Sequence, residues 1–465
     1  MQRCCTLTRE LTQVGIGTVD TALGRRQDGR RRSAACEPET SLNMAILMIF
    51  VLSVVTLMHY RGCRDLRYPP LLVSGLWLGV LGFYYVSPIP VDPISPATSL
   101  IFLVAVLSFS GGAQLAFVLN ALRLPMIKRR IRRSGPSIFH RPLRLFLLIA
   151  SVCLLPVMFA KANALAEQSG FDDWLVGLRV ELASPGSAGY GLLGNASMLS
   201  YFTTFIYAIE HGDNLKDKLQ FYVSVVVSVA YASLSTGRTA FFLVLVALMG
   251  IAAMQGRLSP KKLLLGTTGF LACFAVFGVI LSKGGTVDAS WTDNLASLEE
   301  SLAQYTVGAI PAFDQIVRAD APLEYGRNTW LDILNLVRRL TGAPTVSPIH
   351  EEVDVPFSIN VFTALHPPFK DFGIMGVIVA FAVIGAATTY FYLRAAAGER
   401  LHVFFYSLSL SPLLFMTFSD QYFAPMLSWL KYAAAGYLYF RTSKRKQSTS
   451  VQDSAAQRLN PALER

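Results

Sequence analysis

The sequence has little charge for its length. Charged residues make up only 15% of its 465 residues, hydrophobic residues make up 53%, and the mean hydropathy is +0.44. A water-soluble protein with this balance would lack the polar side chains that it needs to cover its surface. The composition therefore excludes a string of soluble domains and indicates a chain that lies largely in a membrane.

Cysteines are also scarce, and no motif for a cofactor is present. The six cysteines show no CxxC pair and no zinc-ligand spacing, so we expect neither a disulfide nor a metal site. The sequence has no Walker motif and no GxGxxG motif, which argues against nucleotide chemistry. We expect no cofactor.

Long apolar runs are what the chain has instead. Runs of about 18 or more apolar residues are typical of membrane-spanning helices. We predict an all-α, polytopic integral membrane helix bundle of about eleven spans, namely 44–59, 69–86, 98–122, 143–160, 191–209, 219–234, 239–254, 263–281, 372–393, 401–418 and 423–440.

The basic residues indicate the orientation of these spans. The net charge is +11, but the Lys and Arg residues lie in short loops between spans, a pattern that does not indicate nucleic-acid binding. The segment from Arg123 to Arg144 has eight of them and no acid, and basic residues also mark the loops near 61–67, 257–262 and 394–400. By the positive-inside rule these loops are cytoplasmic, as is the C-terminus. In a bacterium, the chain would then lie in the inner membrane with its other loops in the periplasm.

The two termini differ from the bundle. Eleven spans with a cytoplasmic C-terminus place residues 1–43 outside, although this polar segment carries seven arginines. Its translocation is unfavourable, so we expect Met44 to start the native protein and residues 1–43 not to belong to it. Residues 44–281 then hold spans one to eight and 372–440 the last three. The polar tail 441–465 is expected to be disordered and cytoplasmic.

Residues 282–371 form the largest segment that a membrane would not accept. They contain twelve acids and six Lys or Arg residues, and they carry helix signals of their own. Ser290 begins a capping-box-like pattern, Pro311 suits a helix start, and Thr329 is placed to cap a helix with Leu334 and Val337 on one face. We predict a large, helical periplasmic loop domain.

The sharpest short signal is the turn Ser235-Thr-Gly-Arg-Thr239 between two spans. We expect Gly237 to permit the turn and Ser235 or Thr236 to cap the next helix. The amides of that helix start carry partial positive charge, and Arg238 adds a cation, a combination that suits a phosphate at the membrane surface. The alternative is an interfacial arginine that extends to lipid headgroups.

Two further arginines of outer loops are candidates for anion binding. Arg327 precedes a predicted helix, and its alternative role is an ion pair with Glu324 or Asp332. Arg179 lies in the loop 161–189 among acidic residues, which favours ion pairing there.

Three residues are candidates for proton transfer. His350 is followed by two glutamates, and His366 lies five residues before Asp371. A histidine beside a carboxylate is suited to take the proton from an attacking hydroxyl group. The alternative for each is an ordinary structural side chain.

Taken together, these features resemble the bacterial oligosaccharide repeat-unit polymerases, the Wzy-type O-antigen polymerases. The resemblance rests on the turn 235–239, the large late outer loop and the segment Asp371-Phe-Gly-Ile-Met-Gly376, and it covers about 44–440 in architecture. One departure is that the Arg–(ten residues)–Gly motif of some members is absent, because Tyr190 follows Arg179 at that spacing.

The resemblance implies a fold similar to the GT-C membrane glycosyltransferases and a metal-free reaction. The implied substrate is an oligosaccharide on undecaprenyl pyrophosphate, with a chain-length regulator protein of the inner membrane as a further partner. It also implies that outer-loop arginines hold the pyrophosphate, here Arg238 and Arg327. An O-antigen ligase, which differs in its acceptor, and a polysaccharide or lipid transporter are the alternatives.

Overall fold

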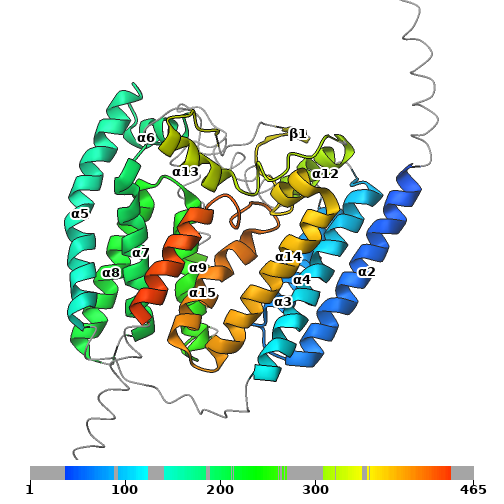
Figure 1. Ribbon diagram of the computed structural model, residues 1–465, viewed down its shortest axis with the longest axis horizontal. Helices are drawn as coiled ribbons and strands as arrows, with labels where there is room; N and C mark the ends of the chain where they lie inside the picture. Colours follow the sequence, from blue (N-terminus) through cyan, green and yellow to red (C-terminus); the bar gives the residue numbers. More distant parts are fainter. Residues whose placement is uncertain are drawn as a thin grey trace, which may run out of the picture.

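The structure is a computed structural model of the chain. The structure describes residues 37–87, 93–123, 141–184, 189–210, 212, 214–259, 261, 264–266, 268–269, 307–319, 321–347, 353–355 and 357–440. Within these residues the chain is a helical bundle with one small β-hairpin (Figure 1).

Six of the described helices are long and apolar enough to cross a membrane: Leu42–Cys63, Pro69–Val86, Pro96–Asn120, Arg141–Gln168, Gly191–Glu210 and His366–Ala396. Each contains or overlaps a predicted span, so the prediction of an all-α membrane bundle is confirmed at this level. The helices at the predicted spans 219–234, 239–254, 401–418 and 423–440 are shorter or less apolar. The predicted span 263–281 lies mostly outside the described residues.

The helices of the bundle form two groups, each with its own apolar core (Figure 1). One group contains α2 (Glu37–Cys63), α3 (Pro69–Val86), α4 (Pro96–Arg123) and α14 (His366–Ala396). The other contains α5 (Arg141–Gln168), α6 (Trp174–Ala183), α7 (Asn195–Glu210), α8 (Leu215–Leu234) and α9 (Arg238–Met254). α15 (Arg400–Phe415) contributes to both cores, and the C-terminal helix 426–440 packs with the second group.

α4 and α14 approach each other at backbone distance. A Cβ atom on Gly112 would overlap the carbonyl oxygen of Ala382, and one on Gly385 would overlap the carbonyl oxygen of Phe109. In a membrane, where lipid is as apolar as leucine, small residues favour association because they allow this close backbone packing. The two glycines therefore determine how closely α14 lies against α4.

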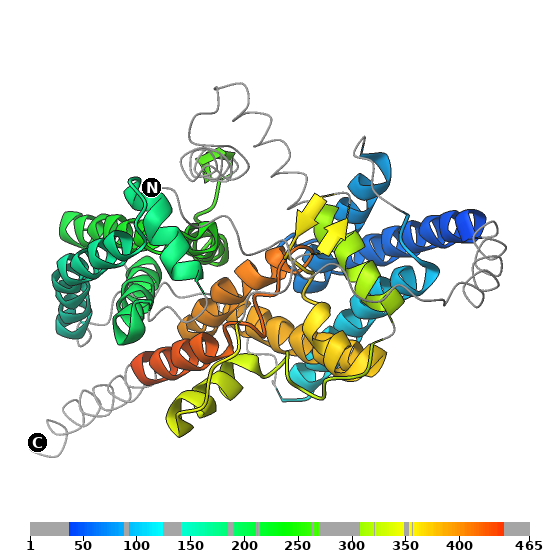
Figure 2. The same ribbon diagram turned by 90° about the horizontal axis from the view of Figure 1, so that it is seen from above.

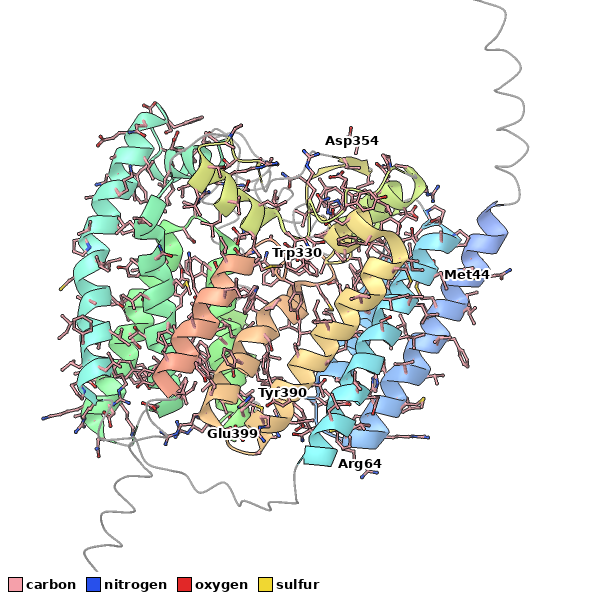
Figure 3. All side chains as sticks on the ribbon, in the orientation of Figure 1. Met44, Arg64, Trp330, Asp354, Tyr390 and Glu399 are labelled. Carbon is pink, nitrogen blue, oxygen red and sulfur yellow. The ribbon has the colours of Figure 1, made fainter. Side chains whose placement is uncertain are left out.

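The two ends of the bundle differ in composition. Arg64 and Glu399 lie at one end, whereas Met44, Trp330 and Asp354 lie toward the other (Figure 3). We call the first the basic end, since the loops that follow α2, α9 and α14 meet there, and the second the loop end. The sorting of basic loops to one end agrees with the sequence prediction. α2 begins at Glu37, before the predicted first span.

Short elements from the predicted loop domain cover the loop end. They are α12 (Ala309–Ala319), α13 (Leu331–Thr341) and an antiparallel hairpin of β1 (Val353–Val355) and β2 (Phe357–Ile359), in which Val353 pairs with Ile359. α12 and the hairpin lie over the group of α2 to α4, whereas α13 lies beside the C-terminal helix (Figure 2). Pro311 lies in the first turn of α12, as predicted, but Trp330 and not Thr329 is the N-cap residue of α13.

Polar contacts fix both elements. The Asp314 carboxylate of α12 accepts hydrogen bonds from the Ser95 amide (2.9 Å) and hydroxyl (2.6 Å) just before α4, and it also pairs with Arg318. The Asp332 carboxylate of α13 accepts a hydrogen bond from the Leu427 amide at 2.7 Å. These contacts connect the loop segment to the start of α4 and to the C-terminal helix.

Candidate functional site

A cavity of about 340 Å³ lies at the loop end, between the starts of α7, α9 and the C-terminal helix and the end of α15. Its size is at the lower end of the range of ligand sites, about 300–1,000 Å³. The described lining residues are mainly hydroxyl, amide and aromatic side chains, with glycine, proline and a few apolar residues: Gly194, Ser197, Met198, Tyr201, Ser235, Gly237, Thr239, Ala240, Leu243, Ser411, Pro412, Gln421, Pro425, Ser428, Trp429 and Tyr432.

The predicted anion-binding turn forms one wall of this cavity, but its geometry differs from the prediction. The residue in the left-handed region is Thr236 (φ 51°), whereas Gly237 is extended (φ −98°). A positive φ is unfavourable for a β-branched residue such as threonine. A residue outside the turn stabilises it, because the Tyr190 hydroxyl donates a hydrogen bond to the Leu234 carbonyl at 2.5 Å, at the end of α8.

The predicted side-chain cap of α9 is also wrong. The N-cap residue is Gly237, which has no side chain to accept a hydrogen bond, and the Ser235 hydroxyl donates back to the Ala232 carbonyl at 2.7 Å. The first amides of α9 are thus not capped by a side chain of the turn. Gly237 and Thr239, on either side of Arg238, line the cavity, so the partly positive start of α9 lies at its wall.

The opposite wall comes from the segment before the C-terminal helix. The Asp420 carboxylate accepts hydrogen bonds from the amides of Tyr422 (2.9 Å), Phe423 (3.0 Å) and Ala424 (2.8 Å). Burial raises the pKa of Asp420, an effect that these three donors oppose. The Trp429 indole N–H donates to the Gln421 carbonyl at 3.0 Å and so joins the C-terminal helix to the segment before it. Two cavity residues, Gln421 and Trp429, are therefore held in a defined arrangement.

The three candidate arginines lie at different places. Arg238 begins α9, and the nitrogens of its guanidinium group are shielded from solvent by the chain. The Arg327 side chain is 61% exposed, and its Nε lies 3.9 Å from Glu324, the weak ion pair considered as its alternative. Arg179 lies within α6. None of the three is among the described residues that line the cavity.

Asp371, a candidate for proton transfer, is fully buried and serves as a backbone cap. Its carboxylate accepts hydrogen bonds from the Asn328 amide (3.1 Å), the Asn328 side chain (2.8 Å) and the Thr329 amide (2.6 Å), just before α13. Two residues later α14 is interrupted at Gly373, which has φ 62° and ψ −151°. These contacts give the segment 371–376 a structural role, namely joining the turn before α13 to the start of α14.

Neither of the two candidate histidines is among the described residues that line the cavity. His366 begins α14, is buried, and stacks on Phe362 with ring centroids 4.6 Å apart. It is not among the described residues of the cavity. His350 lies outside the described residues.

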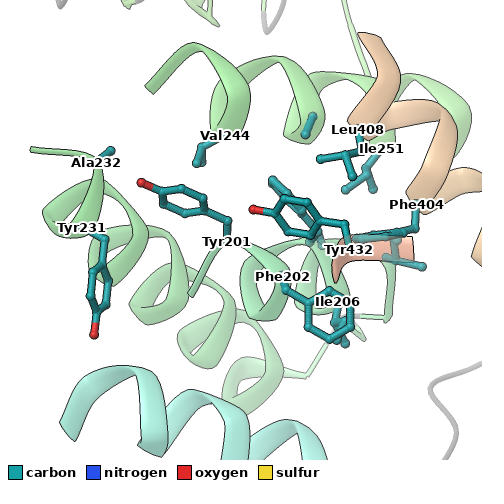
Figure 4. Close-up of a cluster of buried hydrophobic side chains, with 14 of the residues drawn as sticks. Tyr201, Phe202, Ile206, Tyr231, Ala232, Val244, Ile251, Phe404, Leu408 and Tyr432 are labelled. Carbon is teal, nitrogen blue, oxygen red and sulfur yellow. The ribbon is translucent and has the colours of Figure 1, made fainter. Parts of the chain in front are cut away.

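Sequence reasoning missed the residues that give the cavity its chemistry. Tyr201 and Tyr432 both line it, and Figure 4 shows them near each other within the buried cluster of the second helix group. Trp429 and Gln421 are the other two. In the sequence all four lie in or beside predicted spans, where an aromatic residue is usually read as apolar packing. The cluster of polar residues just before span 423–440 was the available signal.

No protein-family model, curated protein or solved structure matches this chain.

Proposed function

We propose that this protein is a membrane glycosyltransferase that polymerises oligosaccharide repeat units carried on undecaprenyl pyrophosphate. The product would be O-antigen or a related surface polysaccharide. The observation that carries the proposal is the cavity at the loop end, because it combines hydroxyl and aromatic side chains with the start of α9, whose N-cap residue is a glycine. Such a site suits a sugar joined to a phosphate at a membrane surface.

The proposed topology follows from the charges of the two ends. The basic end is cytoplasmic and the loop end periplasmic, so that the substrate reaches the cavity from the outer leaflet of the inner membrane. The eleven-span count, the GT-C-like architecture and the cytoplasmic C-terminus belong to this proposal. The chain-length regulator remains the proposed protein partner.

The proposed mechanism depends on charge at the leaving group. As the bond between sugar and pyrophosphate breaks, negative charge develops on the phosphate, and the amides at the start of α9 stabilise it. Arg238 begins the same helix, and its guanidinium nitrogens are shielded from solvent, so its positive charge acts with little screening by water. Arg327, largely exposed at the loop end, is the second candidate for the pyrophosphate.

The base that deprotonates the acceptor hydroxyl is proposed to be a histidine. Asp371 is committed to three N–H donors, which leaves His350 and His366 from the original candidates. Because His366 is buried against Phe362, His350 is the preferred choice, although it lies outside the described residues.

The distribution of charge argues against the transporter alternative. Intramembrane charges are common in transporters, where they mark ion and substrate pathways. Here Arg144, Glu210 and Asp217 are buried, but all three lie in the terminal turns of α5, α7 and α8. An O-antigen ligase would use the same chemistry with a different acceptor, and no described residue separates the two enzymes.

Deletion of the gene discriminates the three functions. A strain without a polymerase is expected to make lipopolysaccharide capped with a single repeat unit, and a strain without a ligase to make none that is capped. The readout is the ladder of chain lengths on a gel. A normal ladder would reject the polymerase proposal.

Substitutions of Arg238 test the phosphate contact. Loss of one charge-assisted contact to a developing anion costs about 3 kcal/mol, on the order of a hundredfold in rate. Arg238→Ala is therefore expected to shorten the ladder strongly at matched protein level. Arg238→Lys separates a contribution from charge alone, which lysine retains, from a bidentate guanidinium contact, which lysine loses. Equal ladders for all three proteins would make Arg238 an ordinary interfacial residue.

A further inference from the structure

The cavity at the loop end has no charged lining residue among the residues that the structure describes. Its polar groups are the hydroxyls of serine, threonine and tyrosine side chains, the Gln421 amide and the Trp429 indole. These groups form hydrogen bonds with neutral hydroxyl and amide groups of a ligand. Among the described lining residues, positive charge comes only from the start of α9, which the phosphate of the proposed substrate would occupy. A carboxylate elsewhere in the cavity would be left uncompensated, and an uncompensated carboxylate is costly to remove from water.

From this lining we infer that the cavity binds one uncharged sugar of the lipid-linked repeat unit and excludes an acidic sugar such as a uronic acid. The inference deepens the proposed function and rests on it for the source of the sugar. The volume of about 340 Å³ suits a small part of a ligand and not a whole repeat unit, so the remaining sugars and the lipid would lie outside the cavity.

The aromatic residues support a sugar as the occupant. The Trp429 N–H is already used by the Gln421 carbonyl, which leaves the apolar ring surface of Trp429 to offer a ligand. Tyr201 and Tyr432 contribute two more rings and two hydroxyl groups to the same cavity. A sugar ring has both kinds of surface, because its C–H groups pack on aromatic faces while its hydroxyl groups form hydrogen bonds.

A lipid acyl chain fits the cavity less well. Nine of the sixteen described lining residues carry a hydroxyl, amide or indole N–H group. Four of these groups already donate a hydrogen bond within the protein, namely those of Ser197, Ser235, Gln421 and Trp429. An acyl chain would offer the other groups no hydrogen bond as water is displaced, at about 1–3 kcal/mol for each one that is fully buried without a partner. A hydroxyl-rich ligand avoids this cost.

The test uses the purified full-length protein in detergent and saturation-transfer NMR. The probes are three neutral disaccharides, namely chitobiose, cellobiose and lactose, and the acidic disaccharide digalacturonate. We expect at least one neutral disaccharide to bind with a Kd in the millimolar range, and digalacturonate to bind at least tenfold more weakly. Equal binding of digalacturonate, or binding of none of the neutral probes, would overturn the inference.

Variants assign the binding to this cavity. Trp429→Ala is expected to weaken the neutral probe at least tenfold and Trp429→Phe much less, since phenylalanine retains a ring. Ser428→Lys, which places a cation in the lining, is expected to reverse the preference in favour of digalacturonate. Trp330→Ala is the matched control, because Trp330 is a half-exposed tryptophan of the loop end outside the described lining. Equal binding by the Trp429→Ala and Trp330→Ala proteins would contradict the inference.

Monodisperse elution in size-exclusion chromatography verifies that each variant is folded. The outcomes also separate this inference from the proposed function. Binding of a neutral disaccharide by a protein whose deletion leaves the ladder unchanged would support the cavity assignment and reject the polymerase. An altered ladder with no disaccharide binding would support the polymerase and reject the cavity assignment.

Discussion

The two ends of this bundle use polar residues in opposite ways. At the basic end, charged side chains pair with one another between helices, whereas at the loop end neutral polar side chains surround a cavity. Arg144 of α5 is the clearest case: it contacts Asp217 of α8 at 3.2 Å and the Glu210 carbonyl of α7 at 3.3 Å, and it lies over the ring of Tyr207. The same cluster includes Arg400 of α15 and Tyr439, which both contact the Glu210 carboxylate.

A second cluster at the basic end connects the two helix groups. Arg67 pairs with Asp65 at 2.8 Å and donates to the Ala253 carbonyl at the end of α9. The Tyr392 hydroxyl of α14 donates to Asp65 at 2.7 Å, and the Tyr406 hydroxyl of α15 donates to the Arg67 carbonyl. Basic residues that indicate orientation in the sequence thus also hold helices together. Charged pairs therefore hold helices together at the basic end, whereas the loop end has the cavity that we propose as a binding site.

The largest expected effect is the loss of Arg144. Arg144→Ala leaves the buried Asp217 without its nearest cation and the buried Glu210 with Arg400 as its remaining ion-pair partner, and breaking a buried pair in this way costs about 4 kcal/mol. We expect most of the protein to be lost from the membrane fraction, measured by immunoblot and by thermal aggregation in detergent.

Arg141→Ala is the control for Arg144. Arg141 also faces Asp217, at 3.6 Å, but its side chain is 56% exposed. Exposed pairs contribute at most about 1 kcal/mol. Similar losses for both variants would contradict the view that burial makes the basic end rigid.

Asp371 is expected to show the next largest effect. Asp371→Ala leaves the donors of Asn328 and Thr329 unsatisfied in a buried place, at a total cost of about 3 kcal/mol. Protein level and polymer should therefore fall together, measured as ladder length against immunoblot intensity. A normal protein level without polymer would restore Asp371 as a catalytic candidate.

Substitution of Gly112 tests the contact between α4 and α14. Gly112→Ala forces the two helices apart, at a cost of about 2 kcal/mol for overpacking. Its neighbour offers a matched control, because a Cβ atom on Gly111 meets no atom within 4 Å. The melting temperature in detergent should fall for Gly112→Ala and stay near the wild-type value for Gly111→Ala. The reverse order would disprove the close contact between α4 and α14.

The smallest expected effect is a pH dependence at Asp65. Burial alone would raise the pKa of this carboxyl group, but hydrogen bonds from Arg67 and Tyr392 outweigh it and lower the pKa to about 2. A lowered pKa stabilises the fold above the ordinary value near 4, and this stabilisation is lost as the pH falls toward 2. We expect the difference in stability between wild type and Asp65→Asn to shrink by about 1 kcal/mol between pH 6 and pH 3, discounted for solvent screening. Thermal unfolding of both proteins at pH 6 and pH 3 measures this change. The same stability difference at both pH values would contradict the lowered pKa of Asp65.

The sequence predicted the six long apolar helices because their signal is local. Each long apolar run, such as Pro69–Val86, is recognisable without knowledge of its neighbours. The cavity could not be predicted in this way, since its residues come from separate helices that only packing brings together. Asp371 shows a related limit: its position near His366 indicated proton transfer, whereas its N–H partners lie more than forty residues earlier in the chain.

The turn at Ser235–Thr239 could be predicted from the sequence only in part. Its place between two apolar helices was predictable from a short polar motif between two predicted spans. Its internal geometry was not, because Tyr190, which holds the end of α8, lies far away in sequence.

The joint between the turn before α13 and the start of α14 has a consequence for genetics. In a saturation screen scored only by surface polysaccharide, substitutions at Asp371, Gly373 and Gly376 should be depleted as strongly as those at any residue that contacts the substrate. A second score for protein abundance would separate the two classes. Substitutions in the joint should lower both polysaccharide and protein abundance, whereas substitutions of substrate contacts should lower only the polysaccharide. Hits along 371–376 in a single-score screen would therefore report on assembly of the loop end and would not by themselves indicate contact with a substrate.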